Sequence, residues 1–430
     1  MKLFLFLFLA ATVRANDLSD LASAILSNSA PRWLSDTRAF QNVAALKPNQ
    51  GFVPYELNAP FWSDGASKQR WIFVPPGTHV SFSPTNEWRF PPGTLFMKQF
   101  DLAHSDEAPM AWHHLETRFT VVTPTGGIVG VTYRWRDDTN AELLTTNLLA
   151  TVATQHGTRP WYFPSREDCL ACHTPLNGGV LGVNTRQMNR EFAHPNGESK
   201  NQLVAWQRRG MFAPGQSEMI PARLQKLSPV NDSTALIEGR ARSWLDANCA
   251  QCHRPGGTVA TFDARFSTPL LQQQIINAPV LIDEGIDLAR VIAPNDIWRS
   301  ILFLRVNTCE AFKMPPIAHE RVDAAGVAVL REWIESLPGP RVVAPPKVFP
   351  AAGDFNGPVL ITLRHDDPQA VVHFTLDGSS PIKSSPIYSN AIKLTESATV
   401  RARAFKEGST KSIAVQETFI VNSSRSAARQ

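Results

Sequence analysis

The sequence predicts a multidomain protein with a β-rich N-terminal region, a mainly α domain in the middle and an all-β sandwich at the C-terminus. Its 430 residues exceed what one hydrophobic core usually serves. Strand-like alternation occurs toward both ends of the chain, and helix-like spacing occurs within residues 234–337. Hydrophobic residues make up 43% of the chain and charged residues 19%, which excludes wholesale disorder and a coiled coil.

The first 15 residues have the pattern of an export signal. Lys2 precedes an apolar run from Leu3 to Ala11, and Ala15 is a small residue at a typical cleavage position. We therefore expect residues 1–15 to be removed and the mature chain to be periplasmic or secreted. This run and every later apolar run are shorter than the ~18 residues that a membrane helix needs, so we expect no stable membrane span. The net charge of +4 comes without a basic run, so nucleic acid is not an expected partner.

Residues 16–160 are expected to form a β-rich domain. A strand signal at 119–122 is followed by the turn residues 124–127 and by a second strand signal at 128–135. In the second strand, apolar residues alternate with smaller or polar ones, as in a half-buried strand. The alternating residues are Val129, Val131, Tyr133 and Trp135. Residues 161–233 follow as a separate region, which carries the first of two cysteine motifs.

Residues 234–337 are expected to form a compact, mainly α domain. Helical spacing is clearest at 235–248 and at 323–337. Proline-rich residues 338–354 then predict a linker, and strand signals return at 359–363, 370–376 and 399–405. The sandwich is expected over residues 355–422, with a tail at 423–430.

Two motifs have the form Cys-x-x-Cys-His. They are Cys169-Leu170-Ala171-Cys172-His173 and Cys249-Ala250-Gln251-Cys252-His253. Two thiols at this spacing can form thioether bonds to one porphyrin, and the next residue can bind its iron through a histidine nitrogen. The sequence therefore predicts two covalent c-type haems, attached through Cys169/Cys172 and Cys249/Cys252, with His173 and His253 as iron ligands.

Two other kinds of site use paired cysteines. Four cysteine thiolates could together bind one zinc ion, but that site has no need of a histidine directly after each pair. A thioredoxin-like dithiol would require a βαβ pattern, which surrounds neither pair. The fifth cysteine, Cys309, is expected to be a buried structural residue rather than a reactive thiol.

Met314 is the expected distal ligand of the second haem. Pro315 and Pro316 follow it, and a proline pair can hold a loop thioether against the open face of a haem. A core methionine that fills a gap is the alternative. The first motif has no nearby Met-Pro, and its distal ligand is unassigned. We expect a residue distant in sequence to close this iron, and the candidates are Met188, Met211, Met219, His104, His113, His114, His156 and His194.

These motifs together resemble known cytochromes. Residues 234–337 resemble a class I cytochrome c domain through the segments 244–253, 313–316 and 330–334. The resemblance implies electron transfer through a six-coordinate haem, with Gly239 and Trp244 of the first helix packed against the last helix. With the segments 62–66 and 184–187 included, residues 31–337 resemble a family of exported bacterial dihaem c-type cytochromes.

The C-terminal segment resembles a different family. Residues 373–381 and 400–405 resemble the small β-sandwich found at the C-terminus of chitobiase-like exported enzymes. Alternation puts Val400, Ala402 and Ala404 on one face of a strand. The resemblance implies a spacer or interaction module, with carbohydrate or surface contact as one role.

We therefore expect an exported dihaem electron carrier that serves a redox partner protein, and we predict no catalytic residue. One alternative is a haem enzyme of peroxidase or oxidase type, with an open site at the first haem. The other is a haem-bearing adhesion or scaffold protein.

Overall fold

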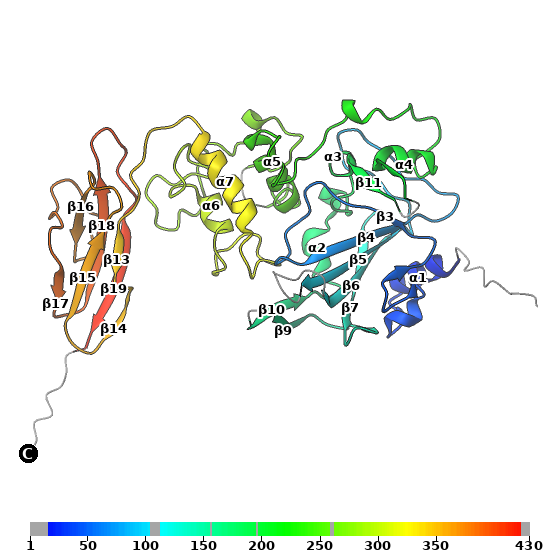
Figure 1. Cartoon of the computed structure of the whole chain (residues 1–430), viewed down its shortest axis with the longest axis horizontal. Coiled ribbons are helices and arrows are strands. Elements are labelled where there is room, and N and C mark those ends of the chain that lie inside the picture. Colours follow the sequence, from blue (N-terminus) through cyan, green and yellow to red (C-terminus); the bar gives the residue numbers. More distant parts are fainter. Residues whose placement is uncertain (1–15, 104–111, 155–156, 195–196, 259–261, 423–430) are drawn as a thin grey trace, which may run out of the picture. The chain divides into compact units, whose positions relative to one another are not determined.

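The computed structural model describes residues 16–103, 112–154, 157–194, 197–258 and 262–422. The expected signal at 1–15 and tail at 423–430 lie outside the described residues. The chain divides into two compact units. The first unit comprises residues up to Gln273 together with Thr308–Gly326, and the second comprises Gln274–Asn307 together with residues from Val327 onward (Figure 1).

A six-stranded antiparallel sheet forms the centre of the first unit. Its strands follow the chain in the order β3-β4-β5-β6-β7-β8. Their bounds are β3 Val53–Pro54, β4 Ser67–Phe73, β5 Leu95–Ala103, β6 Trp112–Val122, β7 Ile128–Trp135 and β8 Ala141–Leu143. The strand signals expected at 119–122 and 128–135 are thus confirmed.

One face of this sheet packs against helix α1 (Asn16–Leu26). Leu18 and Ile25 of the helix join Phe119 and Tyr133 of the sheet in one buried cluster. The alternation expected in β7 is confirmed, because its odd-numbered apolar residues all belong to this cluster. Two-residue periodicity is enough to assign one face of such a strand to the core.

The opposite face of the sheet has two different ends. At one end, Ile72, Phe96, Val122 and Ile128 join a second buried cluster. At the other end, the same face carries basic side chains from β4, β5 and β6.

The other elements of the first unit are short. Its small antiparallel pairs are β1 Phe40–Asn42 with β2 Lys47–Pro48, β9 Leu148–Thr154 with β10 Gly157–Phe163, and β11 Glu191–Ala193 with β12 Ser199–Asn201. Its further helices are α2 Cys169–Cys172, α3 Thr185–Met188, α4 Gln202–Arg208 and α5 Ile237–Asn248.

The second unit contains the expected β-sandwich. One sheet has the order β13-β15-β17 and the other β14-β19-β18-β16. The strands are β13 Lys347–Phe349, β14 Gly353–Phe355, β15 Val359–Arg364, β16 Val371–Thr375, β17 Ile392–Leu394, β18 Ala398–Phe405 and β19 Val415–Val421. The core includes Val400, Ala402 and Ala404, so the alternation expected in β18 is confirmed.

Strand β18 also connects the sandwich to residues 274–307. Arg403 is only 3% exposed, and its Nη2 lies 3.0 Å from Oδ1 of Asp287. Arg299 donates a hydrogen bond of 3.2 Å to the carbonyl of Lys411. The same unit includes α6 Ile301–Val306 and most of α7 Ala324–Ser336.

The expected fold class is wrong for residues 234–337, which do not form a mainly α domain. Helices α5 and α7 occur where helical spacing predicted them, but α6 adds only 6 residues between them. The other described residues of this segment form one 3-10 helix (η4 Leu270–Gln272), turns, bends and isolated bridges. Two properties of the segment prevent longer helices. Prolines lack the backbone donor, and several residues adopt left-handed backbone angles, for example Gln274, Asn277 and Leu288.

No helix in the described part of the chain is long and apolar enough to cross a bilayer. Cys309 is exposed, so the expectation that it is buried is wrong.

Candidate functional site

The first Cys-x-x-Cys-His motif begins on the short helix α2, directly after strand β10. Asp168 anchors the start of this helix: its carboxylate accepts hydrogen bonds from the backbone N–H of Ser165 (2.8 Å) and the hydroxyl of Tyr162 (2.7 Å). Cys169 packs closely over Gly130 of β7. A Cβ added at Gly130 would lie 2.6 Å from the Cys169 sulfur, so the absence of a side chain there makes room for the thiol.

His173 is held as a neutral imidazole with one free ring nitrogen. Its Nδ1 lies 2.6 Å from the carbonyl of Gly179, so Nδ1 carries the proton and donates it. Burial lowers the pKa of His173 to about 4, against the opposing effect of the Gly179 hydrogen bond. Nε2 is then the nitrogen that can bind a metal, and a hydrogen bond from Nδ1–H to a carbonyl is the usual support for such a ligand.

A cavity of about 200 Å³ adjoins this motif. Cys169, Cys172 and His173 all line it. The basic end of the sheet also lines it, through Lys68, Arg70, Lys98 and Arg118. Both thiols and the imidazole of the motif therefore share one space with four basic side chains.

The second motif begins at the C-terminal end of α5. The backbone N–H of His253 donates to the carbonyl of Cys249 at 2.8 Å, so the motif continues with a helical turn. The His253 ring stacks on Phe262 with ring centroids 4.3 Å apart and an angle of 12° between planes. Burial, the Cys252 thiol and Asp246 together raise the pKa of Cys249 to about 12. All five cysteines are free thiols, so neither motif is closed by a disulfide.

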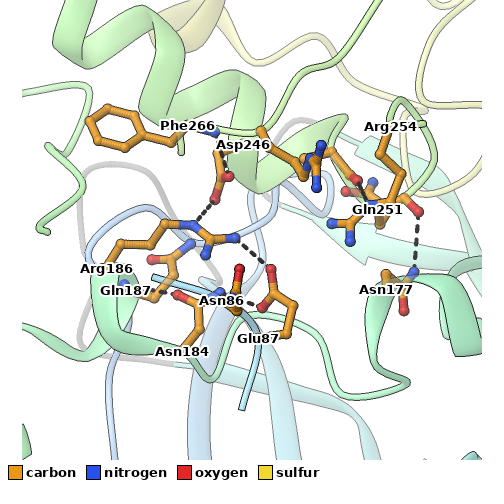
Figure 2. A network of polar contacts seen from close by, with 12 residues as sticks. Asn86, Glu87, Asn177, Asn184, Arg186, Gln187, Asp246, Gln251, Arg254 and Phe266 are labelled. Atoms are coloured by element: carbon orange, nitrogen blue, oxygen red, sulfur yellow. Dashed lines mark hydrogen bonds and ion pairs between the residues drawn. The ribbon is translucent and has the colours of Figure 1, made fainter. Parts of the chain in front are cut away.

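The two motifs lie next to one another in the first unit. Asn177, 1% exposed, donates from Nδ2 to the carbonyl of Cys172 at 2.6 Å. The same Nδ2 donates to the carbonyl of Gln251 at 3.1 Å (Figure 2). One amide group thus joins the first motif to the second across 74 residues of sequence. Burial raises the pKa of Cys172 to about 11, and the Cys252 thiol adds to this rise, which is further evidence that the motifs are close.

A buried arginine fixes the helix that leads into the second motif. Arg186, 4% exposed, binds Glu87 through Nη2 (2.7 Å) and Asp246 of α5 through Nε (3.0 Å) (Figure 2). Burial alone would lower the pKa of Arg186, but the attraction of Asp246 and Glu87 outweighs burial and raises it. Asp246 also accepts a hydrogen bond from the backbone N–H of Phe266 at 2.9 Å. This network restrains the position of α5 relative to the first motif.

Helix α5 also contacts the beginning of α7. The Trp244 indole N–H donates to Oδ2 of Asp323 at 2.7 Å, and a Cβ at Gly326 would lie 2.0 Å from the same nitrogen. The contact that the cytochrome resemblance implied is therefore present for Trp244. It is absent for Gly239, where an added Cβ would meet nothing within 4 Å.

Met314 lies half-buried in the segment 308–326, which belongs to the same unit as both motifs. Ile317 and Ala318, which follow its proline pair, line the cavity beside His173. The segment expected to serve the second haem therefore also borders the first site.

None of the described distal-ligand candidates of the first haem lines this cavity. Met188, Met211 and Met219 are buried in the apolar cluster that covers the sheet. His114 instead lies 2.7 Å from Asp101, and His113 and His194 are also outside the cavity wall. His104 and His156 lie outside the described residues.

The sequence interpretation did not identify the four basic side chains that line the cavity. A signal was available, because Lys68, Arg70, Lys98 and Arg118 each interrupt an otherwise strand-like segment. A charged residue inside a strand that is covered on both faces needs a partner or a function.

Within the part of the chain that the structure describes, no three His, Cys, Asp or Glu side chains come close enough to hold a metal ion. The single four-cysteine zinc site therefore has no geometric support. The first motif has the donors that a c-type haem would need, which are two free thiols and an adjacent histidine, together with a supporting hydrogen bond and a cavity. The second motif supplies two free thiols and an adjacent histidine.

Comparison with known proteins identifies one family. The family model of the chitobiase/beta-hexosaminidase C-terminal domain matches residues 350–417. This match supports the resemblance of the C-terminal sandwich and gives no support to the cytochrome resemblance of residues 234–337. No curated protein matches the chain.

Proposed function

We propose that this chain is an exported dihaem c-type cytochrome that carries electrons through two covalently bound haems. The attachment residues are Cys169 and Cys172 for the first haem and Cys249 and Cys252 for the second. His173 and His253 are the proximal ligands, and Met314 is the distal ligand of the second haem. When bound, these groups supply one-electron chemistry that no side chain of the protein supplies by itself.

The observation that carries this proposal is the contact between the two motifs. Asn177 bonds to the carbonyls of both, and Arg186 fixes the helix that ends at the second motif. Haems attached to these two neighbouring motifs would be held within one unit, which would suit transfer of an electron between them. Buried and fully bonded supports of this kind also keep rearrangement small when the charge of the centre changes.

The residues of the first motif have separate tasks in this proposal. Gly179 fixes the ring orientation of His173 through Nδ1, and Gly130 leaves room for the Cys169 sulfur. Asp168 holds the start of α2. Each of these contacts orients an attachment residue or the proximal ligand.

Haem stoichiometry tests the proposal. The full chain should be matured in a host with a cytochrome c assembly system and examined by haemochrome assay and intact mass, which should give two covalent haems per chain. Cys169→Ala with Cys172→Ala should remove one haem, and Cys249→Ala with Cys252→Ala should remove the other. Zinc, or haem that acidified solvent extracts, would contradict the proposal.

A haem enzyme with an open first site is a second candidate. It is favoured by the cavity beside His173, which none of the described His and Met candidates lines. Carbon monoxide added to the reduced protein distinguishes the two functions. Rapid stoichiometric binding at the first haem would support the enzyme, and an unchanged spectrum would support the carrier.

We also propose periplasmic or secreted localisation, on the basis of the export signal at 1–15. For the C-terminal sandwich we propose a role as an interaction module. Its similarity to the chitobiase/beta-hexosaminidase C-terminal domain is compatible with carbohydrate contact. Affinity electrophoresis of the full chain through gels that contain a soluble polysaccharide tests this role, since specific retardation is expected only if the polysaccharide binds.

A further inference from the structure

Basic side chains gather on one face of three neighbouring strands. In the register of the sheet, Arg70 of β4 lies opposite Lys98 of β5, and Lys98 lies opposite Arg118 of β6. Like charges at directly opposed positions destabilise an antiparallel pair. Three consecutive strands carry this unfavourable arrangement at the same level of the sheet.

Two of these side chains, Lys98 and Arg118, converge with Lys68 on one aromatic ring. The charged atoms of Lys68, Lys98 and Arg118 lie 5.9, 5.5 and 4.4 Å from the ring centroid of Phe100. Cation–π attraction offsets part of their mutual repulsion, but a single ring can compensate only a small part of several buried charges. The geometry thus shows a compact cluster of basic side chains, which we call the basic wall: Lys68, Arg70, Lys98 and Arg118.

The basic wall has little negative charge to balance it. Among the described residues, Arg118 pairs with Glu116 at 2.5 Å, whereas Lys68, Arg70 and Lys98 form no ion pair. Arg70 is 7% exposed, and its buried Nε has no hydrogen-bond partner in the described part of the chain. Within the described ranges, the one hydrogen bond that Lys68 donates is to the carbonyl of Phe61.

The acids that line the cavity are engaged elsewhere. Glu87 and Asp246 both bind Arg186. Asp168 accepts hydrogen bonds from Tyr162 and from Ser165. None of these three carboxylates forms an ion pair with the basic wall. Burial and the neighbouring basic side chains lower the pKa of Lys68 well below its usual range and that of Lys98 to about 7. The guanidinium groups keep their charge at pH 7, and a buried guanidinium without an acid partner, as at Arg70, is costly to a fold.

We propose that the basic wall is a binding site for an oxyanion, such as a carboxylate, inside the cavity beside His173. Arginine and lysine donors supply charge-assisted hydrogen bonds to such a group, and the ligand supplies the missing negative charge. Two sources have this chemistry: a propionate group of a haem attached to the first motif, or a free small anion. The propionate source rests on the proposed function, whereas the site itself does not.

The test uses the full mature chain, loaded with haem, and two variants of the wall. Arg70→Gln removes a guanidinium charge, and Lys98→Gln removes an amine whose pKa burial lowers to about 7. Neither change leaves an acid unpaired, so both variants should fold, as far-UV circular dichroism can check. Lys393→Gln, at an exposed lysine of β17, is the matched control. Calorimetric titration with sulfate and with acetate, at constant ionic strength, measures free-anion binding. Optical redox titration over a range of pH measures the potential of the first haem.

If a free anion is the ligand, the unmodified chain and the control bind it saturably, and both wall variants weaken binding roughly tenfold or more. If a propionate is the ligand, free anions do not bind. Both wall variants then lower the redox potential of the first haem. They also raise the pH at which this potential changes, because the propionate loses a basic partner and its pKa rises. A cation with a merely structural role would not move that pH.

The proposal is overturned if free anions do not bind and the wall variants leave the pH dependence of the potential unchanged. Failure of the proposed function gives a different result, which is the absence of covalent haem. In that case, sulfate and acetate titrations of the same full chain still test the wall, because saturable binding that Lys98→Gln abolishes would support it. No binding to that haem-free chain would overturn it.

Discussion

Arg186 should contribute strongly to the stability of the first unit. It lies between Glu87 and Asp246 and is almost inaccessible to water. Arg186→Met keeps much of the side-chain length but leaves two carboxylates without their cation, one of them in α5 just before the second motif. Removing one partner of a buried ion pair costs about 3–5 kcal/mol. We expect a loss of this size in the free energy of unfolding of the first unit.

Guanidinium unfolding of the haem-loaded chain at pH 7 measures this loss. The chain has two units, so two transitions should be fitted separately, and the transition of the second unit serves as an internal reference. The matched control combines Arg186→Met with Glu87→Gln and Asp246→Asn. Because this triple variant buries no unpaired charge, it should recover more than half of the loss.

The reasoning is refuted if Arg186→Met costs less than about 1 kcal/mol, the range of an exposed ion pair. It is also refuted if the triple variant is no more stable than the single variant, since the loss would then come from packing. Arg186→Lys should be intermediate, because a single ammonium cannot reproduce the fork of a guanidinium that reaches two carboxylates.

Three further results are expected. Met314→Ala should make the second haem high-spin or water-ligated and lower its potential in an optical redox titration, since a thioether favours reduced iron; an unchanged spectrum would make Met314 a packing residue. Gly130→Ala should destabilise the first unit by about 1–3 kcal/mol in a denaturant titration, because the new Cβ would meet the Cys169 sulfur at 2.6 Å. Gly239→Ala is the control and should be neutral or slightly stabilising, because its Cβ would meet nothing within 4 Å among the described residues. Equal stability of the two variants would contradict this reasoning. Burial opposes the charge of Glu87, but the attraction of Arg186 lowers the pKa of Glu87 below its unfolded value of 4.5. The ionised carboxylate therefore stabilises the fold above pH 4.5, and this stabilisation is lost as the pH falls through the lower folded pKa. Thermal unfolding between pH 3 and 7 should show a weaker pH dependence for Glu87→Gln than for the unmodified chain, and identical profiles would argue against this role.

Local patterns in the sequence predicted local structure well. The alternation from Val129 to Trp135 and from Val400 to Ala404 identified the buried faces of β7 and β18. Helical spacing likewise located α5 and α7. Period and side-chain type are sufficient for such assignments, because they depend on neighbours within one element.

Longer-range features could not be predicted in this way. Two correctly located helices were extended into a helical domain, although prolines and left-handed residues interrupt the chain between them. The opposition of Lys98 to Arg70 and Arg118 depends on the register of three strands. The contact of Asn177 with Gln251 joins residues 74 positions apart, and neither residue type indicates a partner by itself. For the candidate site, the sequence therefore predicted the donor atoms but not their surroundings.

The burial of the motif cysteines has a consequence for biosynthesis. A thiol reacts with a vinyl group as its thiolate, and burial raises the pKa of Cys172 to about 11 and that of Cys249 to about 12. At neutral pH, both thiols of the folded chain therefore carry their proton, which slows their reaction with a vinyl group. On the proposed function, attachment should then be faster on a chain that has not yet buried these cysteines than on the folded chain.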